Sequence, residues 1–307
     1  MRRLLIVLIV LAVVGAAAGW ILTEPRVLAA GDLPNHTADV ANGERLFWAG
    51  GCSSCHAEPE GRQDDLPHLG GGEPLVTPFG TFVAPNISPD PDDGIGNWSA
   101  LEFVNAMKHG VGDDGEHLYP AFPYLSYQRM TLTDLIDLKG FMDTLPEVDG
   151  KAPGHQLGFP FNIRRGLGMW KLLYADGETF EPDPAADDMV NRGAYLVNGP
   201  GHCGECHTPR NLIGGPIGDR YLAGGPSPEG AGRIPNITSH ADGLGGWSDF
   251  DLLGVFAQGQ KPFFQGAFTG QMGDVTANTM RLPPEDHEAI VAYLKTVPAV
   301  ADEAVEE

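Results

Sequence analysis

Two copies of the pattern C-x-x-C-H decide most of the chemistry that this 307-residue chain can support, one at residues 52–56 and one at 203–207. In such a pattern two thiols add across the vinyl groups of a porphyrin, and the following histidine ligates the iron from one face. A redox C-x-x-C pair has no need of that histidine, and a zinc site would need further soft ligands. The pattern predicts two covalent haems, attached through Cys52, Cys55, Cys203 and Cys206, with His56 and His207 as iron ligands.

The two motifs use all four cysteines of the chain. None remains for a disulfide, a catalytic nucleophile or a thiolate ligand to iron, so cysteine-ligated haem chemistry is excluded. Stability must therefore come from the core and the haems rather than from disulfides.

The flanks of the two motifs repeat. Pro-Asn-Ile-Ser at 85–88 matches Pro-Asn-Ile-Thr at 235–238, and a glycine-rich Trp-Ser segment at 94–99 matches 243–248. The apolar segment 138–148, closed by proline, matches 290–300 in the same way. All pairs lie about 150 residues apart, which indicates a tandem duplication. Each repeat predicts three helices: one before the motif, one after the tryptophan, and one that closes the domain. Ser99 and Glu102 have capping-box spacing at the start of the second of these.

The N-terminus is apolar and uncharged from Leu4 to Leu22, after Arg2 and Arg3. As a helix this segment would span about 28 Å, close to the hydrocarbon thickness of a bilayer. The alternative is a signal peptide cleaved near residues 16–18. Because apolar residues resume beyond that site at Trp20, we expect an uncleaved anchor. Either interpretation keeps the arginines in the cytoplasm and exports the rest, which predicts haem domains in the periplasm, at the bacterial inner membrane.

The formal net charge is −22, from 41 acidic and 19 basic residues. A polyanion would be repelled, so binding to nucleic acid is excluded. The acidic residues are scattered along the chain, and they indicate either a solubilising surface or an acidic face that docks a basic redox partner.

The connector between the repeats contains an apolar and basic stretch at 159–174. At helical spacing Ile163, Leu167, Trp170 and Leu173–Tyr174 share a face, which predicts a helix that clamps the two domains together. Arg164 and Arg165 are also candidate partners of the haem propionates, because a guanidinium matches a carboxylate in a bidentate way.

The sixth ligand of each iron decides between an electron carrier and an enzyme with an open iron position. The loop before the closing helix contains Met130 in the first repeat, and Met272 and Met280 in the second. Met280 lies 150 residues after Met130, so repeat symmetry alone would favour it. The histidine alternatives are His117 for the first haem and His240 or His287 for the second.

Three further segments carry a family resemblance: Leu-Tyr-Pro-Ala-Phe-Pro-Tyr at 118–124, the flanks of the second motif at 201–210, and Met-Gly-Asp-Val at 272–275. Over most of residues 40–300 the chain resembles membrane-associated dihaem c-type cytochromes of bacteria. It is similar to the cytochrome subunits of periplasmic alcohol, gluconate and aldehyde dehydrogenases. In that family the methionine of M-x-x-V is a ligand, which favours Met272. Many of those subunits have methionine where this chain has Phe122, and they often carry three haems.

The resemblance implies a mainly α fold of two tandem cytochrome c-like helical haem domains with long loops, plus an N-terminal transmembrane helix. We place the anchor and its linker at 1–30, the first haem domain at 31–148, the connector at 149–188, and the second haem domain with an acidic tail at 189–307. The predicted iron ligands are His56, Met130, His207 and Met272.

The predicted function is electron transfer rather than enzymatic catalysis. The chain would pass single electrons between a dehydrogenase or a quinol–cytochrome c reductase and a soluble cytochrome or terminal oxidase. The alternative is a dihaem peroxidase, which would need one open iron position with acid–base groups such as His109, Glu116 and His117 nearby.

Overall fold

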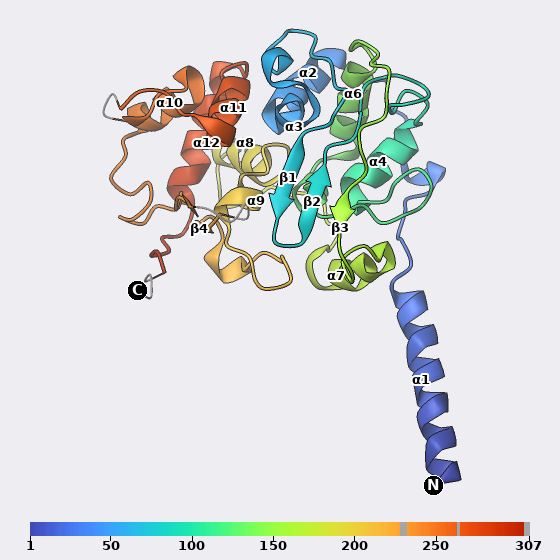
Figure 1. Ribbon diagram of the computed structural model, residues 1–307. Coiled ribbons are helices and arrows are strands. Elements are labelled where there is room, and N and C mark those ends of the chain that lie inside the picture. The colour runs from blue at the N-terminus through green and yellow to red at the C-terminus, as the bar shows by residue number, and fades with distance from the viewer. Residues whose placement is uncertain (228–231, 263–264, 304–307) are drawn as a thin grey trace.

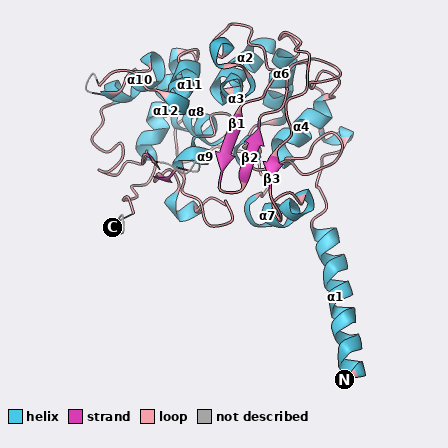
Figure 2. Cartoon of the chain, viewed as in Figure 1, coloured by secondary structure: helices cyan, strands magenta, loops and turns pink. Residues whose placement is uncertain are grey.

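The computed structural model describes residues 1–227, 232–262 and 265–303, so residues 304–307 of the predicted acidic tail lie outside the described part. Helices joined by long loops make up most of the body, and the few strands are short (Figure 2). The predicted mainly α fold is confirmed. One long helix, α1 (Arg2–Leu22), extends away from the body (Figure 1).

The two halves of the body contain equivalent helices. The first half contains α2 (Val40–Gly50), α3 (Cys52–His56), α4 (Ala100–His109), α5 (Tyr124–Tyr127) and α6 (Leu132–Met142). The second half contains α8 (Asp188–Asn198), α9 (Cys203–His207), α10 (Asp249–Gln258), α11 (Gly270–Thr279) and α12 (Pro284–Thr296). The three helices expected in each repeat are all present, and the haem motifs themselves form the short helices α3 and α9.

Local capping explains where α4 and α10, the helices that follow the tryptophan in each repeat, begin and end. Ser99 accepts a hydrogen bond from the Glu102 backbone N–H, and the Glu102 carboxylate accepts one from the Ser99 N–H, so the predicted capping box is confirmed. Ser248 and Asp251 repeat the arrangement at the start of α10. Both helices end at a glycine in the left-handed region, at φ of 58° for Gly110 and 63° for Gly259.

The core of each half is the crossing of its first and last helices, α2 with α6 and α8 with α12. A glycine lies at each crossing. A Cβ on Gly43 would be 2.1 Å from the Asp137 carbonyl oxygen, and one on Gly193 would be 1.8 Å from that of Ala289. Only glycine allows this approach. The buried cluster around the crossings is continuous across both halves, and includes Leu46, Leu135, Leu196, Ile290 and Leu294.

The segments after the motifs contribute to two small antiparallel sheets. The first joins β1 (Pro74–Thr77), β2 (Gly80–Val83) and β3 (Gln156–Leu157), with Leu75 opposite Phe82 and Gly80 opposite Leu157. The second joins β4 (Gly225–Pro226) and β5 (Arg233–Ile234). Because β3 belongs to the connector, the first sheet ties the connector to the first half.

Helix α1 is long and apolar enough to cross a membrane, with a mean hydropathy of 2.8, and none of its residues is buried. It ends at Leu22, and the following Thr23 is buried against the body.

The connector helix differs from the prediction. Helix α7 (Leu167–Tyr174) begins only at Leu167, and Ile163 and Leu173 of the predicted buried face are 51% and 67% exposed. The helix does touch both halves, because the Trp170 indole donates to the Ile213 carbonyl at 2.9 Å and the Lys171 ammonium donates to that of His109 at 2.7 Å. The predicted buried face is therefore wrong at Ile163 and Leu173, whereas Trp170 of that face is buried and helps to join α7 to the body.

Candidate haem sites

Helices α3 and α9 each place two thiols and one imidazole on a single turn. The first thiol of each motif, Cys52 or Cys203, is half-buried, and the second, Cys55 or Cys206, is exposed. Burial raises the pKa of the Cys52 and Cys203 thiols to about 12. No disulfide joins any of the four, all of which lie in the described part of the chain. Each motif thus places its two thiols on one helical turn, where both can bond to the same porphyrin.

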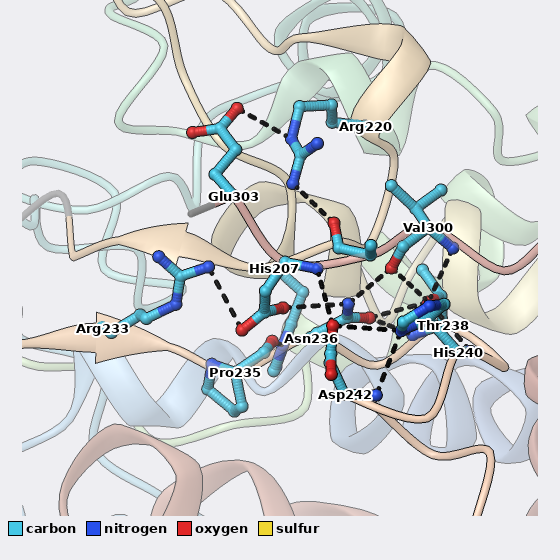
Figure 3. Close-up of polar contacts among 12 residues, drawn as sticks. His207, Arg220, Arg233, Pro235, Asn236, Thr238, His240, Asp242, Val300 and Glu303 are labelled. Carbon is cyan, nitrogen blue, oxygen red and sulfur yellow. Dashed lines mark hydrogen bonds and ion pairs between the residues drawn. The ribbon is translucent and has the colours of Figure 1, made fainter. Parts of the chain in front are cut away.

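Each motif histidine is hydrogen-bonded to the backbone carbonyl of an equivalent proline. His56 Nδ1 lies 2.8 Å from the Pro85 carbonyl oxygen, and His207 Nδ1 lies 2.8 Å from that of Pro235 (Figure 3). A carbonyl only accepts, so Nδ1 carries the proton and the lone pair of Nε2 faces away, available to a metal. Burial lowers the pKa of both imidazoles, although the carbonyl acts in the opposite direction, and this favours the neutral ligating form.

A glycine brings each proline carbonyl close to its motif. The Gly71 N–H donates to the His56 carbonyl at 2.8 Å, and the Gly224 N–H donates to that of His207 at 2.7 Å. Both glycines have positive φ, 74° and 68°. A Cβ would lie 2.4 Å from the Pro85 carbonyl carbon in one half and 2.6 Å from that of Pro235 in the other. Glycine is required at both positions, because φ is positive there and because a side chain would collide with the proline.

A buried asparagine next to each proline fixes the proline loop to the segment that follows the closing helix. Asn86 Nδ2 donates to the Val148 carbonyl at 2.7 Å, and Asn236 Nδ2 donates to that of Val300 at 2.7 Å (Figure 3). The amide oxygens accept from backbone N–H groups two residues further on. The sequence showed Pro-Asn-Ile-Ser/Thr as a repeat but gave it no role. The signal that could have indicated a role is that the proline and the asparagine recur at about the same offset of 150 residues as the haem motifs.

The donor set fits a c-type haem in both halves. Each site combines two thiols, one imidazole with its Nδ1 proton held by a carbonyl, and a glycine turn that leaves no room for a side chain. Among the described residues, no group of three or more His, Cys, Asp or Glu side chains converges on a separate metal site.

The two sites meet between the halves, and the contacts are reciprocal. The third residue of the first motif, Ser54, accepts from Asn278 of the second half at 2.7 Å. The third residue of the second motif, Glu205, accepts from Ser126 of the first half at 3.0 Å. His202, just before the second motif, has its Nε2 3.1 Å from the carbonyl oxygen of Gly50, just before the first. Each motif is therefore held by the other half, and the segments that lead into them touch.

Comparison with known proteins agrees with this arrangement. Residues 40–146 match the cytochrome c family. A dihaem c-type cytochrome of Cereibacter sphaeroides is 49% identical over 303 residues, covering 98% of this chain and all of that protein. This chain belongs to the dihaem c-type cytochromes.

Two further relatives of the cytochrome are longer. The fructose dehydrogenase cytochrome subunit of Gluconobacter japonicus is 39% identical over 284 residues, and the gluconate 2-dehydrogenase cytochrome c subunit of Pantoea cypripedii is 35% identical over 269 residues. They match 91% and 85% of this chain, which spans only 56% and 60% of their lengths.

The comparisons confirm the predicted cofactors and the predicted type of function. The cytochrome carries two covalent haem c groups and transfers electrons. The related proteins are electron-transfer subunits rather than catalytic ones, and the peroxidase alternative has no support among them.

The three candidate methionines of the cytochrome lie in different surroundings. Met130 follows α5 and is fully buried, with its Cγ 3.6 Å from the position of a Cβ on Gly199. Met272 is half-buried on α11 and packs against the core. Met280 ends α11 and is 44% exposed. A distal ligand must exclude water from the iron, so burial favours Met130 and Met272 over Met280.

The alternative histidines are engaged elsewhere. His117 Nε2 lies 2.9 Å from the Thr23 carbonyl oxygen at the end of α1, and His287 Nε2 lies 2.7 Å from that of Thr279. His240 Nδ1 accepts from the Asp242 N–H at 3.1 Å. These contacts hold the three imidazoles in the scaffold.

The connector arginines lie at the junction with α1. Arg164 pairs with Glu116 at 3.1 Å, and its guanidinium lies 4.8 Å from the centre of the Tyr119 ring. Arg165 donates to the Thr23 hydroxyl at 3.0 Å. Their pairing with haem propionates stays a prediction.

Proposed function

We propose that this cytochrome carries single electrons on the periplasmic face of the bacterial inner membrane, with α1 as its anchor. Its electron donor is a dehydrogenase or a quinol–cytochrome c reductase, and its acceptor is a soluble cytochrome or terminal oxidase. The named relatives are cytochrome subunits of fructose, alcohol and gluconate dehydrogenases, which supports a dehydrogenase as donor. The apolar length of α1 supports the anchor.

The reciprocal contacts between each motif and the opposite half are the observation that carries this proposal. A dihaem carrier has to pass an electron from one haem to the other, and this requires the two attachment sites to be close and rigidly held. The bonds from Asn278 to Ser54 and from Ser126 to Glu205 meet that requirement, because each ties one motif to the other half.

We assign the haem-binding residues as follows. Each haem, when bound, supplies a one-electron couple. Cys52 and Cys55 would hold the first haem and Cys203 and Cys206 the second, while His56 and His207 would present Nε2 to the irons. Met130 and Met272 would supply the second ligand of each iron and exclude water from it.

The domain boundaries are also part of the proposal: haem domains at 31–148 and 189–307, with the connector at 149–188. The equivalent helix crossings, α2 with α6 and α8 with α12, support the division.

Purification of the full chain from washed, detergent-solubilised membranes tests the function. We expect the cytochrome to stay with the membranes and to bring down a redox partner that reduces it when the partner's substrate is added. Recovery in the soluble periplasmic fraction would refute the anchor, and a haem that no membrane dehydrogenase or reductase can reduce would refute the carrier role.

Haem counting and spectroscopy test the residues. Cys203→Ala should lower the protein mass by one covalently bound haem. Loss of part of the thioether–Fe(III) charge-transfer band is expected in Met130→Ala and in Met272→Ala. Met280→Ala is the matched control and should keep the band; the reverse result would assign the second ligand to Met280.

A further inference from the structure

Half of the exposed large apolar side chains beyond α1 gather in two short segments. Sixteen such side chains follow Leu22 in the described residues, and eight of them lie in 159–173 and 212–213. We call these eight the basal surface: Phe159, Phe161, Ile163, Met169, Leu172, Leu173, Leu212 and Ile213. Scattered apolar residues need no explanation, but a cluster of this kind marks an interaction site.

The two segments are continuous in space. Trp170 of α7 donates to the Ile213 carbonyl at 2.9 Å, and the Asn211 amide donates to the Tyr174 hydroxyl at 2.9 Å. Phe79, at the turn between β1 and β2, bridges them further: its ring centre lies 5.0 Å from that of Phe161, and its ring edge lies beside Gly214. The basal surface is thus one patch with a hydrogen-bonded frame.

The patch adjoins the end of the anchor. The Arg165 guanidinium lies 4.3 Å from the centre of the Trp20 ring and also donates to the Trp20 carbonyl. Gly168 of α7 packs directly on Thr23, where a Cβ would come within 2.5 Å of the Thr23 carbonyl oxygen. Figure 1 shows α7 at the end of the body from which α1 extends. If α1 spans a bilayer, the patch lies at the level of the lipid headgroups.

The charge of this segment suits a phospholipid surface. Residues 159–174 contain no carboxylate, in a chain whose net charge is −22, and they carry Arg164 and Arg165; the third basic residue, Lys171, turns inward to the carbonyls of His109 and Gly110. An acidic segment here would be repelled by lipid phosphates. Basic residues beside large apolar ones are the composition of helices that lie in a membrane interface.

We propose that the basal surface docks on the bilayer that α1 crosses. Its apolar side chains enter the interface between headgroups and acyl chains, and α7 lies in the plane of the membrane. This rests on the proposed anchoring by α1 and goes beyond it, because an anchor alone would leave the body free to swing. Docking holds the two haem sites at a fixed height and orientation above the lipid.

Photo-crosslinking of the full haem-loaded cytochrome tests this, in nanodiscs of phosphatidylethanolamine and phosphatidylglycerol. Benzoylphenylalanine replaces one residue in each protein: Phe159 or Leu173 in the basal surface, Trp20 in the anchor, or Phe250 on α10. Phe250 is the matched control, since it is 78% exposed, close to the 81% of Phe159. We expect lipid adducts, detected by mass spectrometry, at the first three positions and at least tenfold fewer at Phe250.

The remaining outcomes separate this proposal from the anchor. Adducts at Trp20 without adducts at Phe159 and Leu173 would overturn the docking surface and leave the anchor standing. No adducts at any position would overturn both. Equal adducts at Phe250, or crosslinks from Leu173 to a second protein chain, would show that the patch has no preference for lipid.

Discussion

Replacement of Gly193 by alanine isolates the contact on which the second half is built. The new Cβ would lie 1.8 Å from the Ala289 carbonyl oxygen, although such atoms keep at least 3.0 Å. Helices α8 and α12 must therefore part by about 1.2 Å at their crossing. The obstacle is a backbone carbonyl rather than a flexible side chain, so it cannot rotate away.

The expected cost is the difference between two opposing effects. Overpacking a filled core costs about 1–3 kcal/mol, and the backbone obstacle places this case at or above the upper end. Alanine in place of glycine inside a helix returns about 1 kcal/mol, largely through the unfolded state. We therefore expect Gly193→Ala to lower the free energy of unfolding by about 2 kcal/mol or more.

Gly254 provides the matched control. It lies at the corresponding interior position of α10 in the same half, and a Cβ there would meet nothing within 4 Å. Gly254→Ala should raise the free energy of unfolding by about 0.5–1 kcal/mol. Urea unfolding of the haem-loaded proteins, followed by circular dichroism and by the Soret band, measures both. A Gly193→Ala protein as stable as wild type, or a loss of equal size in Gly254→Ala, would refute the reasoning.

Three further predictions concern contacts between or within the halves. The carboxylate of Asp286 is fully buried and is held by Arg45 of the first half and by Arg192 at 2.9 Å. Burial raises the pKa of this carboxylate, but the two guanidinium groups lower it by more, so the pKa lies below its usual range. Asp286→Asn should therefore cost about 2 kcal/mol in urea unfolding at pH 7, less than for a fully buried pair because both arginines can rehydrate. The loss should shrink below about pH 4, as wild type loses the carboxylate, and a loss that is the same at pH 3 and pH 7 would contradict this. Asn236→Ala removes the bond to Val300 and should cost about 1–2 kcal/mol, measured by thermal unfolding, whereas no change would show that the proline loop is held by other contacts. A double-mutant cycle of Ser126→Ala and Glu205→Ala should give a coupling of about 1 kcal/mol, and zero coupling would mean that this contact between the halves adds no stability.

The sequence alone was enough for features that depend on local spacing. The haem motifs and the cap at Ser99 follow from residues a few positions apart, and the duplication follows from short blocks that recur at a constant offset of about 150 residues. The hydrogen bond from His56 to the carbonyl of Pro85 could not be predicted, because it joins residues 29 positions apart through a backbone atom that every residue has. Two residues of the connector's apolar face were wrongly predicted to be buried, for a different reason. Periodicity at Ile163 and Leu173 shows that a face is apolar, but not whether protein or another apolar medium covers it.

The crosswise bonds from Asn278 to Ser54 and from Ser126 to Glu205 bear on how the protein is made. Haem attachment needs access to both thiols of a motif, and in the finished fold the first thiol of each motif is half-buried and the third residue is bonded to the opposite half. We therefore expect both attachment reactions to precede the final docking of the halves. On this view, the two bonds would close only after each motif has received its haem, so the loading of one half would bear on the folding of the other.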